Sequence, residues 1–381
     1  MKHSTFRIIL VSVVFIGILS FVFLNAIFPI VKDIKSGENR AMATKPVLYL
    51  QHPDQYPDQY EKYYNDNFSL RSRLIKSLNY IYIKYFHKSP PIANKIVIGN
   101  NDWLYMGGNE LDSYSGDHRF TKSELNILKE EFEYRKKYLD ARSIKYYVMI
   151  APVKAIIYPE NISNTVYRKN NQSWGEQIND YLEKNSSVKP ISVYSILKKE
   201  KQSQVLYFKL DNHWNQIGAF YATNEILKRI HVDFPSVNQL NLKDFKIKSV
   251  EKDDGNIANQ LFDTPLFKDV EYTLEPYKGF KSKEVDPVGY PVVPGFPYAF
   301  EYEKDRMIAG SKQPKILIIS DSFGGAVFPL LSEQFSRSVK IFDAWQYKLN
   351  EDIIEKEKPD IVILIMLEAN IRNMFGFLSK K

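Results

Sequence analysis

Two polar stretches of the sequence carry residue types that work together in nucleophilic catalysis. The first is Ser320-Asp321-Ser322, which ends the apolar run Ile316–Ile319 and is followed by two glycines. A serine on a sharp turn between a buried strand and a helix exposes its hydroxyl at the carboxyl edge of a sheet. This position favours Ser322 as a nucleophile, and an Asp-Ser turn that only closes a strand is the alternative.

The second stretch is Asp211-Asn212-His213-Trp214. A serine hydroxyl is a poor nucleophile until a base removes its proton, and the usual base is a histidine that a carboxylate holds in one tautomer. Asp211 and His213 supply such a base and carboxylate on one short loop. An aspartate that caps the next helix beside an exposed histidine is the alternative that these residues leave open.

The elements that must position these residues alternate between strands and helices. We predict strands at 96–98, 103–105, 144–150, 191–193, 205–211, 316–319 and 360–367, and helices within 61–86 and at 121–142, 174–184, 194–199, from 215 or 216, and at 326–331. This order is typical of an α/β protein, with a parallel or mixed sheet flanked by helices. Residues 265–305 show little periodicity and predict a long surface excursion.

Composition excludes several classes of function. The 52 basic and 45 acidic residues are spread along all 381 positions without a basic block, so nucleic acid is not an expected partner. The chain has no cysteine, which excludes disulfides, thiolate metal sites and a cysteine nucleophile. The histidines other than His213 have no paired ligands at metal spacing, so we expect no metal site.

The N-terminus predicts attachment to a membrane. Residues 8–31 carry no charge, and Ile8–Phe28 is almost entirely apolar, long enough to span about 30 Å as a helix. Lys2 and Arg7 precede this run and favour a cytoplasmic N-terminus with an extracytoplasmic body. We predict an uncleaved membrane anchor at 1–31, a stalk at 32–60 and one extracytoplasmic domain at 61–381. A cleaved signal peptide is the alternative.

Seven short motifs follow one another along most of the chain after the apolar segment. They are Glu38-Asn39-Arg40 with Lys45-Pro46, Tyr64–Phe68 with Arg71, Val97–Tyr105, Ala151–Lys154 with Ile157–Glu160, Asp211–Trp214 with Gly218-Ala219, Gly255–Ala258, and Asp321–Phe323. Through their order and spacing the sequence resembles the SGNH-hydrolase-like proteins of polysaccharide O-acetylation, the alginate O-acetyltransferase family with a DHHW-type motif.

The resemblance implies an SGNH-like catalytic domain with a triad of Ser322, His213 and Asp211, in the chain order Asp–His–Ser. It implies transfer of an acetyl group to a hydroxyl of an exported polysaccharide. A membrane-bound O-acyltransferase partner or an acetylated donor would supply that group, and no cofactor would be bound. SGNH proteins also place an asparagine in the oxyanion hole, which makes Asn370 a candidate donor. A polar strand terminus is the alternative for Asn370.

Trp214 is adjacent to the expected base, and we predict that it lines the substrate site. Two other functions are open to the same sequence. One is a carbohydrate acetyl esterase with the same triad, in which water takes the acetyl group. The other is a non-catalytic, membrane-anchored scaffold that binds polysaccharide.

Overall fold

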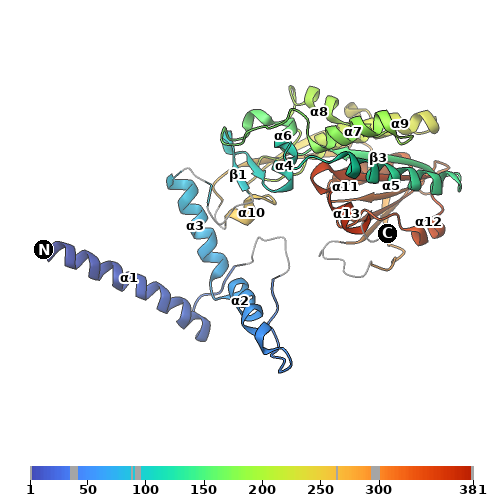
Figure 1. Cartoon of the computed structure of the whole chain (residues 1–381). Coiled ribbons are helices and arrows are strands. Elements are labelled where there is room, and N and C mark those ends of the chain that lie inside the picture. The colour runs from blue at the N-terminus through green and yellow to red at the C-terminus, as the bar shows by residue number, and fades with distance from the viewer. Residues whose placement is uncertain are drawn as a thin grey trace. The chain divides into compact units, whose positions relative to one another are not determined.

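The computed structural model describes residues 2–34, 42–86, 89–90, 96–262, 265–292 and 301–378 (Figure 1). The motif residues 38–40 lie outside these ranges. Contacts along the chain divide it into two compact units. The first comprises Met1–Asn94 and Ala258–Leu266, and the second comprises Lys95–Ile257 and Phe267–Lys381. The described residues 61–86, which we expected to belong to the extracytoplasmic domain, fall within the first unit.

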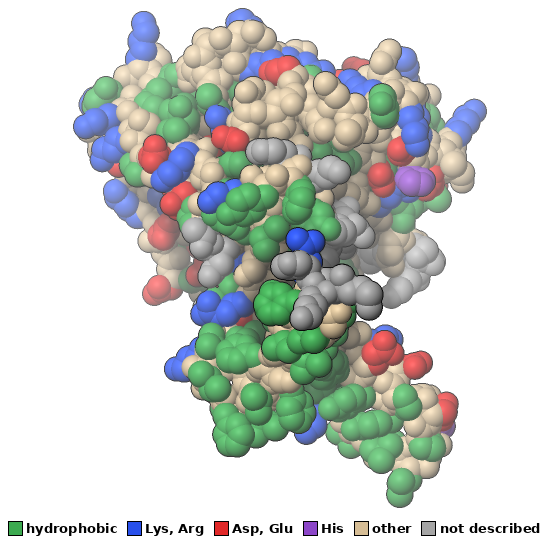
Figure 2. All heavy atoms as spheres, turned by 90° about the vertical axis from the view of Figure 1, so that its left-hand side faces the viewer, with side chains coloured by type: hydrophobic (Ala, Val, Ile, Leu, Met, Phe, Trp, Pro, Cys, Tyr) green, Lys and Arg blue, Asp and Glu red, His purple; other side chains and the backbone are tan. Residues whose placement is uncertain are grey.

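The first unit is helical. Its elements are α1 (Lys2–Ile27), η1 (Pro53–Gln55), α2 (Tyr56–Asn67), α3 (Arg71–Phe86) and α10 (Ala258–Leu261). Among the described residues, one helical stretch is long and apolar enough to cross a membrane, the 23 residues Thr5–Ile27 of α1. Most of its large apolar side chains are exposed, and Figure 2 shows hydrophobic side chains gathered over α1 in the lower part of the view.

The second unit is built on a mixed seven-stranded sheet, which confirms the predicted α/β architecture. Its strands are β3 (Lys145–Ala151), β4 (Ile191–Ser192), β7 (Lys283–Val285), β8 (Glu303–Met307), β9 (Lys315–Ser320), β10 (Arg337–Phe342) and β11 (Ile361–Leu367). They run in the spatial order β4-β3-β11-β9-β10-β8-β7. The first five are parallel, and β8 and β7 add an antiparallel edge.

Further elements surround this sheet (Figure 1). They are β1 (Ile96–Ile98), β2 (Leu104–Met106), α4 (Asn109–Ser115), α5 (Lys122–Asp140), α6 (Lys154–Ile157), α7 (Trp174–Asn185), α8 (Tyr194–Glu200), α9 (Gln216–Asp233), β5 (Phe245–Lys252), β6 (Asp269–Pro276), α11 (Gly324–Leu331), α12 (Glu351–Glu357) and α13 (Asn373–Leu378). Short 3-10 turns lie at Asn100–Asp102, Pro159–Asn161, Leu242–Asp244, Ser332–Gln334 and Glu368–Asn370.

Strand β9 is buried on both faces because its side chains alternate between two hydrophobic cores. Ile316 and Ile318 pack with apolar residues of α8, α9 and α11. Leu317 and Ile319 pack with residues of α5, α7 and α12. Helices therefore cover both faces of the sheet, and an unbroken apolar run is what such a strand requires.

Two predictions about strands were wrong. Residues 205–211 do not form a sheet strand, because their one strand-like contact is an isolated antiparallel bridge between Tyr207 and Trp214. The segment 265–305 contains β6, β7 and the start of β8 in its described part, so it is not only a surface excursion. β6 pairs along its whole length with β5, a pairing that local periodicity does not reveal.

A buried carboxylate joins the elements at the carboxyl edge of the sheet. Glu368, fully buried just after β11, accepts hydrogen bonds from Val153 N (2.8 Å), Ser173 Oγ (2.5 Å), Gly175 N (2.7 Å) and Tyr194 Oη (3.2 Å). Ser173 and Gly175 lie at the start of α7, where the helix dipole also favours a negative charge. Glu368 thus connects the loop after β3 with α7 and α8.

We expect Glu368→Ala to lower the free energy of unfolding by roughly 3 kcal/mol, because four donors lose their acceptor in a buried site. Glu368→Gln should not restore stability, since its NH2 group would face a backbone N–H in either orientation. Urea unfolding of the full chain in detergent measures both variants. Glu355→Ala is the control, because that carboxylate is exposed and should matter little. A Glu368→Ala variant as stable as this control would contradict the assignment.

Candidate active site

Ser322 lies on the turn between β9 and α11. The strand ends at Ser320, Asp321 is fully buried, and Ser322 is exposed. The turn requires a glycine at position 324, because a Cβ there would lie 2.2 Å from Ser320 Oγ. The sequence therefore folds into a sharp strand-to-helix turn that presents the Ser322 hydroxyl to solvent.

The structure brings Asp211, His213 and Ser322 into one hydrogen-bonded series. His213 Nε2 lies 2.7 Å from Ser322 Oγ, and His213 Nδ1 lies 2.6 Å from Asp211 Oδ1. The backbone N–H of His213 also donates to Asp211 Oδ1 (3.0 Å). The carboxylate fixes the ring so that Nδ1 carries a proton and Nε2 is free to accept one from the serine.

The surroundings of this pair keep Asp211 charged and His213 basic. Burial alone would lower the pKa of His213, but the hydrogen bond and the charge of Asp211 outweigh it and raise that pKa above its ordinary value. Burial alone would raise the pKa of Asp211, but the contacts with His213 and the N–H of Asn256 hold it well below its usual range. Asp211 can therefore stabilise the imidazolium that forms when His213 takes a proton.

Lys154 supports the loop that carries Asp211 and His213. Its side chain is buried, and Nζ donates to the carbonyls of Phe208 (3.0 Å), Lys209 (3.0 Å) and Asp211 (2.6 Å). Burial lowers the pKa of Lys154 to about 7, against the opposing charge of Asp211. Three carbonyls need three N–H donors, which only the protonated amine supplies. The Lys209 carbonyl also accepts from Leu104 N (2.9 Å), so this cation adds to the few backbone hydrogen bonds that hold the segment.

The Asp211 carboxylate is also held from the other side. Asn256 N donates to Asp211 Oδ2 (2.8 Å). The backbone reaches this position because residue 255 is glycine, since a Cβ there would lie 2.5 Å from the Leu210 carbonyl oxygen. Asn256 Nδ2 bonds to Asn212 Oδ1 (3.0 Å), and Asn212 Nδ2 bonds to Glu110 Oε1 (2.7 Å). Burial raises the pKa of Glu110 to about 7.

Asp321 organises the turn that carries the serine. Its Oδ1 accepts from Phe323 N (2.9 Å), and its Oδ2 accepts from Tyr347 Oη (2.6 Å), Leu367 N (2.6 Å) and Asn370 Nδ2 (3.1 Å). Phe323 lies in the same turn, Tyr347 lies in the loop after β10, and Leu367 and Asn370 lie at the end of β11 and in the 3-10 turn that follows it. The residue before Ser322 is therefore fixed within its own turn and by two neighbouring segments.

Asn370 lies next to this turn, half-buried at the end of β11. Its amide contacts Asp321, the residue that precedes Ser322. Among the residues that the structure describes, the backbone N–H of Ser322 has no hydrogen-bond acceptor. The Asn370 amide bonds to Asp321 Oδ2 (3.1 Å), and the oxyanion role of Asn370 remains a prediction.

Trp214 is placed differently from the prediction. Its side chain is only 2 % exposed, so it does not line an open substrate site. Its indole N–H donates to the Phe323 carbonyl (3.2 Å), and the two rings pack edge to face at 5.0 Å. The His213 ring also lies 4.9 Å from Phe323. Trp214 therefore joins the histidine loop to the serine turn.

Sequence reasoning missed the supporting residues Lys154, Asn256, Asp321 and Tyr347. Lys154 had one visible signal, a single charge within the apolar run Val153–Ile157. Asn256 and Asp321 lie within two of the motifs that carry the family resemblance, but no local pattern gave them or Tyr347 a role. Over the described ranges, no three His, Asp or Glu side chains gather closely enough to hold a metal ion.

The fold is similar to that of several solved structures. Bacillus cereus PatB1 shares 17 % identity over 73 % of this chain and 97 % of its own, with a TM-score of 0.55. PatB1 with a sulfonyl adduct shares 16 % identity over 72 % and 97 %, with a TM-score of 0.53. A DHHW family protein from Eubacterium siraeum DSM 15702 shares 19 % identity over 73 % and 92 %, with a TM-score of 0.51.

A comparison with curated protein sequences returned no match. Residues 96–344 match the family model of the SGNH hydrolase-like domain of the acetyltransferase AlgX. This match covers the sheet strands β3 to β10, the histidine loop and the serine turn. The chain therefore belongs to the family of SGNH hydrolase-like acetyltransferase domains that includes AlgX.

Proposed function

We propose that this protein is an extracytoplasmic O-acetyltransferase that moves an acetyl group through Ser322 onto a hydroxyl of an exported polysaccharide. Membership of the acetyltransferase family supports the general reaction. The hydrogen-bonded series Asp211–His213–Ser322, with Ser322 exposed to solvent, is the observation that carries the assignment of residues.

The first half of the reaction forms an acetyl-enzyme. His213 Nε2 takes the proton of Ser322 while Oγ attacks the carbonyl carbon of an acetyl donor, and the carbonyl electrons move to its oxygen. The N–H of Ser322, together with Asn370, is suited to stabilise this oxyanion. When the intermediate collapses, the bond to the donor oxygen breaks, and that oxygen receives the proton from His213.

The second half transfers the acetyl group to the acceptor. A sugar hydroxyl gives its proton to His213 as its oxygen attacks the acetyl carbon. Collapse then breaks the bond to Ser322 Oγ, which regains the proton, and the O-acetylated sugar leaves. In this scheme no cofactor is bound, and a membrane-bound acyltransferase partner or an acetylated donor supplies the acetyl group.

The apolar helix α1 supports the location. A helix of this length can span the hydrocarbon core of a bilayer, and the charges at Lys2 and Arg7 favour a cytoplasmic N-terminus. We infer a single-pass anchor that keeps the catalytic domain on the outer face of the membrane. The carbonate-resistant membrane fraction of cells tests this, because a cleaved signal peptide would release the protein.

We expect Ser322→Ala to reduce acetyl transfer at least about 10³-fold, because the proposed acyl intermediate forms on Ser322 Oγ. The assay uses p-nitrophenyl acetate with cello- and mannuronate oligosaccharides, and it detects acetylated sugar. Ser203→Ala, which changes an exposed serine away from the site, is the control.

The same assay on the wild-type protein separates the rival functions. A wild-type protein that releases only acetate is an esterase. A protein that binds glycan but is never labelled by a sulfonyl fluoride is a scaffold.

The raised pKa of His213 predicts the pH dependence of acylation. Only the neutral imidazole can accept the serine proton, so the rate should fall as the pH drops through a value above the ordinary pKa of about 6.5. Asp211→Asn should shift this inflection to lower pH and reduce the plateau rate roughly 10³-fold or more. The rate of labelling by a sulfonyl fluoride between pH 5 and 9 measures both effects. An unshifted inflection would contradict the role of Asp211.

Lys154→Met should slow labelling of Ser322 roughly 10- to 100-fold, because the carbonyls of Phe208 and Asp211 lose their donor, the Lys209 carbonyl keeps only Leu104 N, and the base is displaced. The labelled fraction at completion separates a positioning role of Lys154 from partial unfolding of the variant. A positioning role lowers the rate constant, whereas partial unfolding lowers the final amplitude. Lys201→Met is the matched control, since Lys201 also donates to a backbone carbonyl, that of Ile157, outside this loop. Labelling at the wild-type rate would exclude a positioning role.

A further inference from the structure

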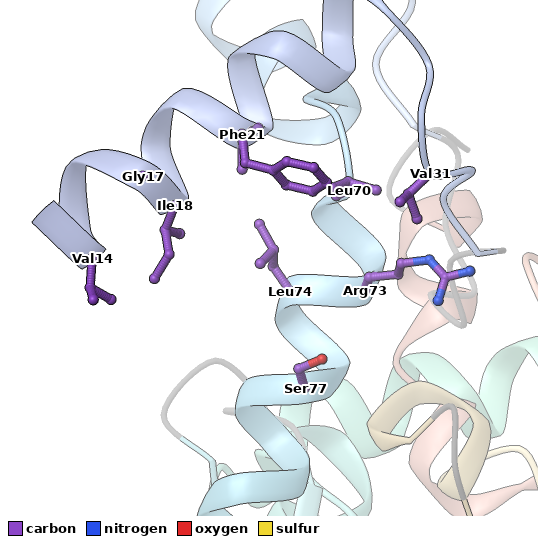
Figure 3. Close-up of a pocket in the computed structure, with 10 residues that line it drawn as sticks. Val14, Gly17, Ile18, Phe21, Val31, Leu70, Arg73, Leu74 and Ser77 are labelled. Carbon is purple, nitrogen blue, oxygen red and sulfur yellow. The ribbon is translucent and has the colours of Figure 1, made fainter.

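The first unit contains an apolar groove between α1 and α3, here named the α1–α3 groove. Its volume is about 550 Å³, and six of the residues that line it are Val14, Ile18, Phe21, Leu70, Leu74 and Ser77. Figure 3 shows Phe21 beside Leu70 at the narrow end, and Val14 and Ser77 at the wide end. The two helices therefore meet at one end and diverge toward the middle of α1.

Polar contacts at the narrow end fix the direction of α3. The Asn25 side chain bonds to both backbone groups of Val31 and donates to Ser69 Oγ (2.8 Å). The Asp33 carboxylate accepts the N–H groups of Ser72 and Arg73, both at 3.1 Å, in the first turn of α3. Each of these contacts lies within a few residues of the end of α1. The start of α3 is therefore tied to the point where α1 ends.

An apolar stripe runs along α3 on the side of the groove. Leu74, Ile81 and Tyr85 lie on α3 at helical spacing with the small polar Ser77 between the first two, and Leu70 immediately precedes the helix. Their exposure increases away from the junction, from 5 % at Leu70 to 40 % at Leu74, 44 % at Ile81 and 66 % at Tyr85. The residues that the structure describes therefore leave most of this stripe uncovered, although it continues the apolar surface of α1.

Another side of α3 is already occupied. Asn79 and Ile83 are buried, and Asn79 Nδ2 donates to the Leu261 carbonyl at the end of α10 (3.1 Å). The remaining side chains give α3 a strongly basic character. It contains Arg71, Arg73, Lys76 and Lys84 and no acidic residue. A helix with an apolar stripe, aromatic residues and only basic charges suits the surface of an anionic membrane.

The depth of the groove identifies what fills it. Helix α1 ends at Ile27, and Phe21 lies six residues before it. Phe21 is therefore about 9 Å from the end of α1 along the helix axis. Ile18 lies about 14 Å from that end on the same scale. Leu74, which lines the groove with these two residues, then lies at the depth of the acyl chains if α1 spans the bilayer.

We propose that lipid acyl chains of the outer leaflet fill the α1–α3 groove and that α3 is a second membrane contact, with its basic side chains at the level of the lipid phosphates. This inference rests on the proposed anchoring by α1. It adds a shallow interfacial helix to a spanning one. The first unit would then be held to the membrane at two places, and its orientation relative to the bilayer would be fixed.

Fluorescence quenching by brominated lipids tests the proposal on the full chain. Leu74→Trp and, separately, Ile81→Trp are reconstituted into vesicles of phosphatidylcholine and phosphatidylglycerol, with or without bromine on the acyl chains. The emission of the four native tryptophans is measured on the wild-type protein and subtracted from that of each variant. We expect the added emission to fall at least twofold in brominated vesicles for both variants. Glu61→Trp, at an exposed position on α2, is the control and should be unaffected.

Two results would overturn the proposal, and they differ. If the protein stays in the vesicles after a carbonate wash but the new tryptophans are quenched no more than the Glu61→Trp control, α3 does not contact lipid. The anchoring by α1 then still holds. If the wash removes the protein from the vesicles, the anchoring itself fails, and the lipid-filled groove fails with it.

Discussion

The hydrogen bond between His213 Nε2 and Ser322 Oγ joins two segments that are 109 residues apart in the chain. Strand β9 delivers the serine to the carboxyl edge of the sheet, where parallel strands place their final residues together. No sheet strand delivers the histidine, because its loop forms only an isolated bridge. The loop depends instead on Lys154, on Asn256 and on the bond from Trp214 to Phe323.

Buried charges that bond to backbone groups set the geometry of the site. Asp321, Glu368 and Lys154 are all buried, and each contacts two or more backbone amides or carbonyls. Burying a charge is costly unless it is fully hydrogen-bonded, and these three charges have several partners each. Because the partners come from different loops, the loops are fixed to one another. The positions of Ser322 and His213 thus depend on buried side chains, chiefly those of Asp321 and Lys154, that bind the backbone of the two loops.

The central strands and the candidate site residues could be predicted from sequence because their signals are local. The run Ile316–Ile319 is apolar throughout, as a strand buried on both faces requires, and Asp211 and His213 are two residues apart. The segment 205–211 was predicted wrongly because its apolar residues face the core without a neighbouring strand. Lys154 and Asp321 act on partners about 50 residues away, and Trp214 is buried by Phe323. No local pattern encodes such contacts.

The exposure of Ser322 bears on how the proposed reaction would favour a sugar hydroxyl over water as the acceptor. If the proposed acetyl-enzyme forms at Ser322, its ester would lie where Ser322 is exposed to solvent, open to water as well as to a sugar. The choice between water and a sugar hydroxyl would then be made by their relative rates of attack. An acceptor hydroxyl that is held beside the ester has a high effective molarity, which lets it outcompete bulk solvent. A long polysaccharide would suit this arrangement. An open edge can admit sugars from the interior of the polysaccharide chain, and the chain could then move along the site without dissociating.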